Sequence, residues 1–177
     1  DRKKTVLELG GSDPYVVLED ADLEPAIATC VQSRLINGGQ SCIAAKRFIL
    51  PRARRSECEA LFVQEMGARR AGDPMADGVD LGPLARRDLR DELHEQVRRS
   101  VDAGARVLVG GEVPEGPGAF YPPTVVTDVA PGMPAYDEEL FGPVASLLFV
   151  ENEAEAIRVA NDTPFGLGAA VFTADVE

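Results

Sequence analysis

Cys42 is the most promising nucleophile in this sequence of 177 residues. It follows residues 37–41 (NGGQS), where two glycines let the backbone turn tightly and present its N–H groups. Such a loop suits a reactive thiolate, because nearby N–H groups can also bind an oxyanion that develops during attack on a carbonyl. A thiol in a loop can equally be a packed side chain, and spacing alone leaves both interpretations open.

The other two cysteines have the pattern of small core residues. Cys30 shares helical spacing with Ile27 and Val31, and Cys58 lies one turn before Leu61. Three cysteines cannot complete a disulfide framework, so we expect free thiols in a reducing compartment, which points to the cytoplasm.

The single histidine, His94, excludes a two-histidine metal site, and we predict no bound metal. His94 stands beside Leu93 among charged residues, which is typical of a solvated or edge histidine. A base that assists Cys42 would therefore be a carboxylate. Glu8 is the candidate, because it stands at the end of a predicted strand against Gly10-Gly11, where a ligand could approach closely.

The charge balance restricts the partners of the chain. It has 18 basic and 30 acidic residues, a formal net charge of −12, which argues against nucleic-acid and anionic-membrane binding. The longest apolar run, Val144–Val150, is far shorter than the ~20 residues that span a bilayer. We therefore expect a soluble globular domain that buries roughly 70% of its unfolded surface and acts on a small molecule.

Strand and helix patterns alternate along the sequence. Strands are predicted over residues 4–9, 15–18, 48–50, 106–109, 144–150 and 169–173, with an extended stretch over 120–129, and helices over about 22–35, 58–66, 89–101 and 153–160. This order favours an α/β fold in which helices cover both faces of a mostly parallel sheet. Residues 166–171 (GLGAAV) imitate a dinucleotide fingerprint, but they follow a helix and open a strand, which is the wrong order.

Four ordered motifs resemble the aldehyde dehydrogenase superfamily. They are residues 7–11 (LELGG) with 20–23 (DADL), residues 39–42 (GQSC), residues 138–144 (EELFGPV), and residues 161–167 (NDTPFGL) with 170–173 (AVFT). The likeness covers nearly the whole chain. Residues 42–48 (CIAAKRF) further resemble bacterial succinate-semialdehyde dehydrogenases.

The resemblance implies a role for each motif residue. Cys42 would attack the aldehyde carbon, hydride would pass to NAD or NADP, and Glu8 would activate water to hydrolyse the thioester to a free acid. Glu139 matches the position that binds the nicotinamide ribose, and Phe141 the position that packs near the nicotinamide ring. Leu9 and Gly10 are assigned to the cofactor side with them. Phe141 could instead be core, and Glu138 is only a neighbour in its motif.

The resemblance also implies that residues 1–177 are a catalytic domain. Family members carry a nucleotide-binding domain, an asparagine of the oxyanion hole and an oligomerisation arm that are not in this sequence. We therefore expect the chain alone to be inactive and the full-length protein to be a homo-oligomer. Some succinate-semialdehyde enzymes have an arginine six residues before the nucleophile. Here that residue is Ile36, and helical geometry turns the nearby Arg34 roughly 200° away.

Two alternatives to aldehyde oxidation remain open. One is a non-catalytic assembly domain that keeps the fold, against which Cys42 and Glu8 argue. The other is a thioester hydrolase that uses the same cysteine and glutamate without a hydride step. The presence of Glu139 and Phe141 favours the redox interpretation over the hydrolase.

Overall fold

The computed structural model describes residues 2–175. Strands and helices follow one another along the chain, with two short 3-10 turns, η1 and η2. The elements are β1 (Pro14–Val17), α1 (Leu23–Arg34), η1 (Ile36–Gly39), β2 (Arg47–Pro51), η2 (Arg52–Arg54), α2 (Arg55–Gly67), α3 (Arg87–Asp102), β3 (Arg106–Val109), β4 (Thr124–Thr127), α4 (Pro134–Asp137), β5 (Val144–Val150), α5 (Glu153–Asn161) and β6 (Ala170–Phe172).

The strands form one sheet in the order β3-β4-β5-β2-β1-β6. Every neighbouring pair is parallel except β3 and β4, which are antiparallel. The central strand β5 is apolar almost throughout (VASLLFV), as expected for a strand that is covered on both faces. The predicted α/β fold with a mostly parallel sheet is therefore confirmed.

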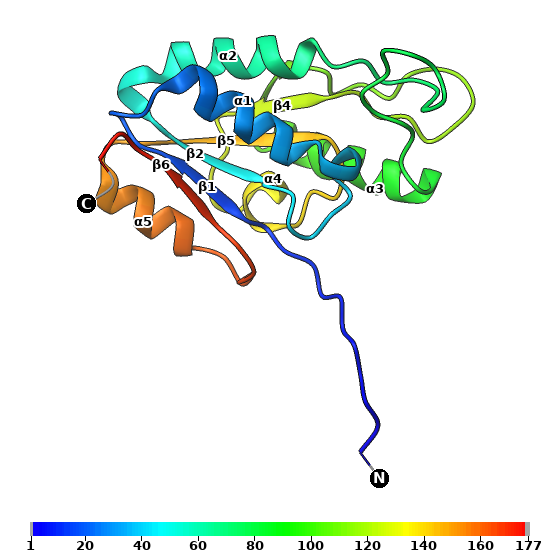
Figure 1. Cartoon of the computed structure of the whole chain (residues 1–177), viewed down its shortest axis with the longest axis horizontal. Helices are drawn as coiled ribbons and strands as arrows, with labels where there is room; N and C mark the ends of the chain where they lie inside the picture. The colour runs from blue at the N-terminus through cyan, green and yellow to red at the C-terminus, as the bar shows by residue number, and fades with distance from the viewer. Residues whose placement is uncertain (1, 176–177) are drawn as a thin grey trace.

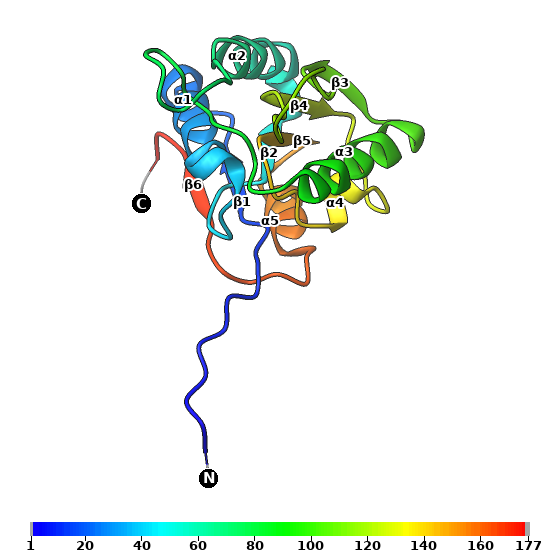
Figure 2. The same cartoon turned by 90° about the vertical axis from the view of Figure 1, so that its right-hand side faces the viewer.

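Helices cover both faces of the sheet (Figures 1 and 2). α1 and α2 pack on one face, and α3, α4 and α5 pack on the other. The side chains of β2 alternate accordingly: Phe48 and Leu50 belong to the core under α1 and α2, whereas Ile49 packs with Val159 of α5. None of the helices within residues 2–175 is long and apolar enough to cross a membrane.

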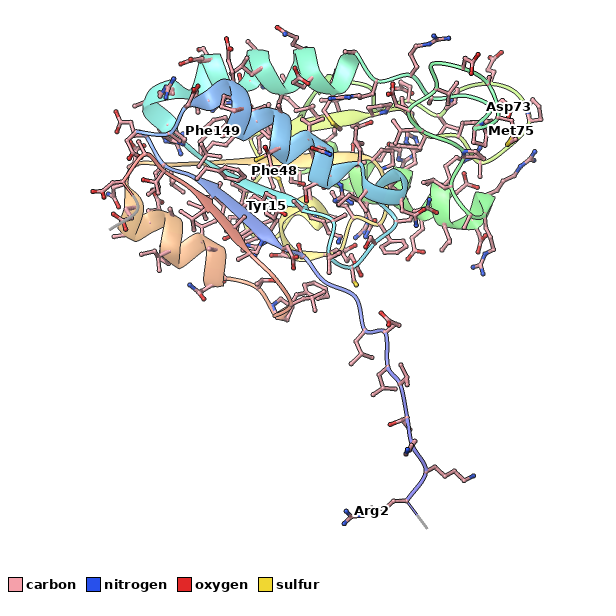
Figure 3. The ribbon with its side chains drawn as sticks, viewed as in Figure 1. Arg2, Tyr15, Phe48, Asp73, Met75 and Phe149 are labelled. Carbon is pink, nitrogen blue, oxygen red and sulfur yellow. The ribbon has the colours of Figure 1, made fainter. Side chains whose placement is uncertain are left out.

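Aromatic contacts fix α2 and a hydrogen bond fixes α1 relative to the central strands. The rings of Tyr15 and Phe48, on β1 and β2, meet edge to face with centroids 6.3 Å apart (Figure 3). Phe48 also contacts Phe62 of α2, at 4.9 Å. The hydroxyl of Ser33, on α1, donates to the hydroxyl of Tyr15 at 2.9 Å. The loop that carries Cys42 thus runs between two anchored elements, α1 and β2.

The predicted helices and most predicted strands are present, but the strand predicted over residues 4–9 is wrong. Residues 2–9 are exposed, adopt no regular structure and run away from the body of the molecule (Figure 1). Their composition is typical of a strand, yet a strand needs a neighbour for its backbone hydrogen bonds, and no strand of residues 2–175 pairs with them. Sequence analysis did not predict the short helix α4.

Candidate active site

A cavity of about 790 Å³ opens at the amino ends of β5, β2 and β1. These three strands are adjacent and parallel, so the segments that precede them meet at one edge of the sheet. Those segments and α3 line the cavity with Glu8, Leu9, Gly10, Gln40, Ser41, Cys42, Leu89, Glu92, Leu93, Gln96, Glu139 and Phe141. All six residues that sequence analysis assigned to catalysis or cofactor binding are in this set.

Cys42 is positioned by a turn in the left-handed region of backbone conformation, which glycine and asparagine adopt most readily. Asn37, Gly38 and Gly39 all have positive φ, between 50° and 79°. A side chain at Gly39 would strike the backbone carbonyl of Gly142, in the segment that precedes β5. The glycines therefore bring the two motifs together and leave the half-buried Cys42 at the cavity wall.

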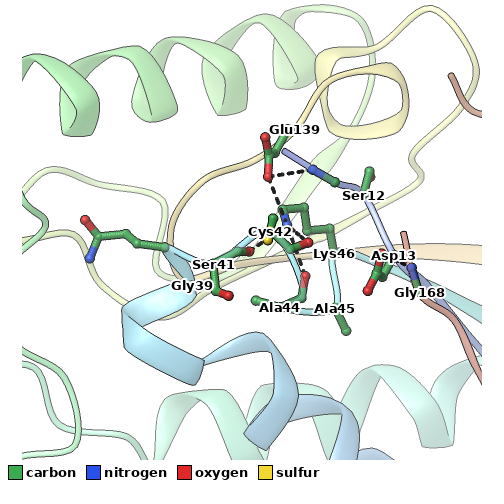
Figure 4. Close-up of polar contacts among 12 residues, drawn as sticks. Ser12, Asp13, Gly39, Ser41, Cys42, Ala44, Ala45, Lys46, Glu139 and Gly168 are labelled. Atoms are coloured by element: carbon green, nitrogen blue, oxygen red, sulfur yellow. Dashed lines mark hydrogen bonds and ion pairs between the residues drawn. The ribbon is translucent and has the colours of Figure 1, made fainter. Parts of the chain in front are cut away.

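Lys46 lies behind the Cys42 loop and is almost completely buried (Figure 4). Its Nζ donates to the carbonyls of Ser41, Cys42 and Ala44, at 3.0, 3.2 and 3.1 Å. The same atom is 3.2 Å from Oε1 of Glu139. Burial lowers the pKa of Lys46, as does the positive charge of Arg34, while Glu139 opposes the shift.

Arg34 is a second buried cation beside this loop. Its Nη2 donates to the carbonyl of Gly39 at 2.7 Å. Burial lowers the pKa of Arg34, and the carboxylate of Glu139 opposes this. Arg34 does not line the cavity. Ile36 is 45% exposed and does not line the cavity either.

Glu8, Leu9 and Gly10 approach the cavity from the exposed N-terminal segment. Glu8 lines it together with Cys42, but the prediction that Glu8 stands at the end of a strand is wrong, because the segment is not a strand. Gly10 has a φ of 83°, and a side chain there would collide with the carboxylate of Glu139. This close approach needs a glycine.

Glu139 and Phe141 form the wall that precedes β5. Oε1 of Glu139 accepts the N–H of Gly11 at 3.1 Å, in addition to its ion pair with Lys46. Phe141 is 37% exposed and lines the cavity, so it is not an ordinary core residue. The neighbouring Glu138 pairs with Arg99 of α3 and lies outside the cavity lining.

The remaining candidate groups lie away from this cavity. Burial raises the pKa of Cys30 to about 12 and that of Cys58 to about 11, as expected for core thiols. His94 is half-buried at the edge of α3, with Nδ1 3.3 Å from the hydroxyl of Tyr121. Residues 2–175 contain no group of His, Cys, Asp and Glu that could hold a metal ion.

Sequence analysis missed Lys46 and the contribution of α3. A signal for Lys46 does exist, because Lys46 and Arg47 interrupt an otherwise apolar run from Ile43 to Leu50. Basic residues at buried positions need partners, so their presence there indicates a polar network. Glu92 and Gln96 carried no comparable signal, since a charged or polar residue on an amphipathic helix is ordinary.

All 177 residues match the model of the Aldehyde dehydrogenase family. The chain belongs to this family. It is 51% identical, over 98% of its length, to the succinate semialdehyde dehydrogenase [NAD(P)+] Sad of Escherichia coli, and 51% identical to an NADP(+) succinate-semialdehyde dehydrogenase of Mycobacterium avium. It covers 37% of each of these relatives.

Solved structures of aldehyde dehydrogenases have the same fold as the chain. Lactaldehyde dehydrogenase from Escherichia coli superposes with a TM-score of 0.92 at 37% identity, over 96% of this chain and 36% of that one. An aldehyde dehydrogenase of Mycobacterium tuberculosis complexed with NAD+ gives 0.91 at 37% identity, over 96% and 35%. The chain thus spans just over a third of the length of the relatives it matches.

Proposed function

We propose that residues 1–177 are the catalytic domain of an enzyme that oxidises an aldehyde to a carboxylic acid with NAD+ or NADP+. The observation that carries this proposal is that Cys42, Glu8 and Glu139 line one cavity. Membership of the Aldehyde dehydrogenase family and relatives named as NAD(P)+ or NADP(+) enzymes support the same reaction.

Cys42 and Glu8 divide the chemistry between them. The thiolate of Cys42 attacks the aldehyde carbon and forms a thiohemiacetal, whose oxyanion the backbone N–H groups beside Cys42 stabilise. Loss of hydride from that carbon leaves a thioester on the sulfur. Glu8 then removes a proton from water, which attacks the thioester and releases the acid and the thiol. Aldehyde, water and oxidised nucleotide become acid, reduced nucleotide and one proton.

The nicotinamide nucleotide supplies the hydride acceptor, and the cavity fits its ribose end. Oε1 of Glu139 is held by Lys46 and Gly11, while Oε2 lies over Gly10, where any side chain would obstruct it. This leaves Oε2 for a ribose hydroxyl, with the exposed ring of Phe141 and the side chain of Leu9 on the same cavity wall. The fit supports the assignment of these four residues to the cofactor side.

Succinate semialdehyde is the substrate we propose, because the relatives at about 50% identity carry that name. The residues that line the cavity include three carboxylates and no basic side chain. A second carboxylate on the substrate would therefore need a cation from another part of the protein. We further propose that the full-length protein is a homo-oligomer, as the family resemblance implies. We place it in a reducing cytoplasm, in keeping with the free thiols.

Replacement of Glu8 by Gln in the full-length protein tests the proposal. Cys42 should still attack and lose hydride, but hydrolysis should stall, so an acyl adduct should accumulate on Cys42 in the presence of aldehyde and nucleotide. Intact mass and peptide mapping would detect it. If no adduct forms and turnover is unchanged, Glu8 has no part in the mechanism. Thioester cleavage without any reduced nucleotide would instead favour the hydrolase alternative.

A further inference from the structure

Lys46 has more acceptors around its ammonium group than that group has donors. Its side chain is 2% exposed, and one atom, Nζ, meets three backbone carbonyls and one carboxylate. An ammonium has three donors, and here four acceptors within 3.2 Å surround it. A cation that is fully coordinated in this way fixes the positions of its partners.

The three carbonyls belong to one short loop, and that loop carries the proposed nucleophile. They come from Ser41, Cys42 and Ala44, and the N–H of Ala44 also donates to the carbonyl of Ser41 at 3.2 Å. Lys46 therefore gathers the carbonyls on the inner side of the loop. The thiol of Cys42 is left at the cavity wall.

The fourth acceptor belongs to a different segment, 97 positions later in the sequence (139 − 42) than Cys42. Oε1 of Glu139 takes both the ion pair with Lys46 and the N–H of Gly11. The side chain of Glu139 is 20% exposed, so it faces the cavity while it is held from behind. Lys46 is thus the side chain that joins the nucleophile loop to the proposed ribose carboxylate.

We propose that Lys46 is a positioning residue that fixes Oε1 of Glu139 and the Cys42 loop together, so that Oε2 of Glu139 is presented to a ribose hydroxyl of the nicotinamide nucleotide. The inference rests on the proposed function. It predicts that Lys46 affects nucleotide affinity only through Glu139, and that it affects turnover in addition through the loop.

A double-mutant cycle in the full-length protein tests this. The variants are Lys46→Met, Glu139→Gln and the pair together, and the measurement is the dissociation constant of NAD+ and of NADP+ without aldehyde. Loss of a hydrogen bond to a charged group corresponds to roughly tenfold to a hundredfold in affinity. Lys46→Met and Glu139→Gln should each weaken binding by about tenfold or more, and the double variant by no more than the worse of the two.

The double variant also guards against failure to fold. Lys46→Met alone leaves a partly buried carboxylate without its cation, which can prevent folding, whereas the double variant removes both charges. If Lys46→Met does not fold, Glu139→Gln is compared with the double variant. The proposal predicts equal nucleotide affinity for these two variants. It also predicts a turnover about tenfold lower in the double variant, because its Cys42 loop has lost the hydrogen bonds from Lys46.

Arg47→Lys is a matched control, because Arg47 is the adjacent buried cation. Its guanidinium donates to the carbonyls of Ser12, Val159 and Ala160, at 3.3, 2.9 and 3.0 Å. It thus holds the end of α5 and the segment before β1, and none of these three residues lines the cavity. This variant should lower thermal stability without a coupling to Glu139 in nucleotide affinity.

Three outcomes would overturn the inference. Unchanged nucleotide affinity in a folded Lys46→Met protein would show that the ion pair does not position Glu139. Additive losses would show that Lys46 acts on the nucleotide independently of Glu139. Absence of NAD+ and NADP+ binding by the unmodified full-length protein would defeat the proposed function, and the inference with it, which is distinguishable from the first two results.

Discussion

The three thiols of this chain differ in burial and in their surroundings rather than in chemistry. Cys30 and Cys58 lie in the core between α1, α2 and the sheet, where burial raises the pKa of each well above that of an exposed thiol. Cys42 lies in a half-buried loop at a cavity wall. The structure thus separates one accessible sulfur from two that are protonated and shielded.

This separation predicts selective alkylation. Treatment of the folded protein with iodoacetamide at pH 8 should label Cys42 at least tenfold faster than Cys30 or Cys58, because the thiolate reacts and the core thiols stay protonated. Peptide mass mapping over a time course measures the three rates. In urea all three should react at similar rates, which serves as the control. Faster labelling of Cys30 or Cys58 in the native state would contradict the assignment.

Motif order predicted cavity-lining residues in the segments that precede the strands, whereas the contribution of α3 was missed. Cys42, Glu139 and Phe141 were found because each stands in a motif with a recognisable order. Lys46 was missed, since the identity of a buried cation is visible in sequence but its partners are not. Its link to Glu139 joins residues 93 positions apart (139 − 46), and only the folded sheet brings them together.

Element boundaries followed the hydrophobic pattern where an element has its neighbours within the chain. The predicted strands over 106–109 and 144–150 match β3 and β5. The strand predicted over residues 4–9 is wrong, because the segment has the composition of a strand but no neighbouring strand within residues 2–175 to hydrogen-bond with. Strand formation is a property of a pair, so composition alone cannot decide it.

Asp128 joins three elements at the end of the sheet. Its carboxylate meets Arg55 of α2 and Arg106 of β3, each at 2.5 Å, just after β4 ends. Burial would raise the pKa of Asp128, but the hydrogen bonds and charges of the two arginines outweigh it and hold the pKa below its ordinary 3.8. A lowered pKa in the folded state stabilises the fold fully above that ordinary value, and this stabilisation declines as the pH falls from there through the lower folded-state pKa.

Asp128→Asn should therefore destabilise the protein at pH 7 and destabilise it less at pH 3. The expected loss at pH 7 is about 1 kcal/mol, because the three side chains are partly exposed and solvent screens their charges. Urea unfolding at both pH values measures it. Asp77→Asn, which changes an exposed loop carboxylate, should leave both midpoints nearly unchanged. An equal loss of unfolding free energy at both pH values would mean that Asp128 stabilises the fold through packing and not through its charge.

At the scale of the whole molecule, the cavity lies at the opposite end of the sheet from where ligands of such folds usually bind. Ligands of open α/β sheets usually bind beyond the carboxyl ends of the strands. Here the candidate site lies at the amino ends of β1, β2 and β5, whereas the hollow at their carboxyl ends is lined by carboxylates such as Glu19, Asp20 and Glu151. Fold class alone would predict a site at the carboxyl ends of the strands, whereas the motif residues indicate the candidate site at the amino ends.

The exposed N-terminal segment bears on what the chain can do alone. Residues 2–9 include Glu8, the proposed base. Apolar side chains of the same segment are exposed to solvent, since Val6 is 91% exposed and Leu9 79% exposed. The cavity-lining residues include no basic side chain for the phosphates of a nucleotide. We therefore expect that the purified 177-residue chain does not oxidise aldehydes with NAD+ or NADP+, even if it folds.

Purified chain and full-length protein should be compared with the same aldehyde, following reduced nucleotide by absorbance. The chain should be slower by about 10²-fold or more, the cost of a single lost stabilising contact, because its cavity-lining residues include no basic side chain for the phosphates. Circular dichroism and alkylation of Cys42 would show that the chain is folded with its loop accessible. Turnover by the chain comparable to that of the full-length protein would mean that residues 1–177 hold a complete nucleotide site, contrary to the domain assignment.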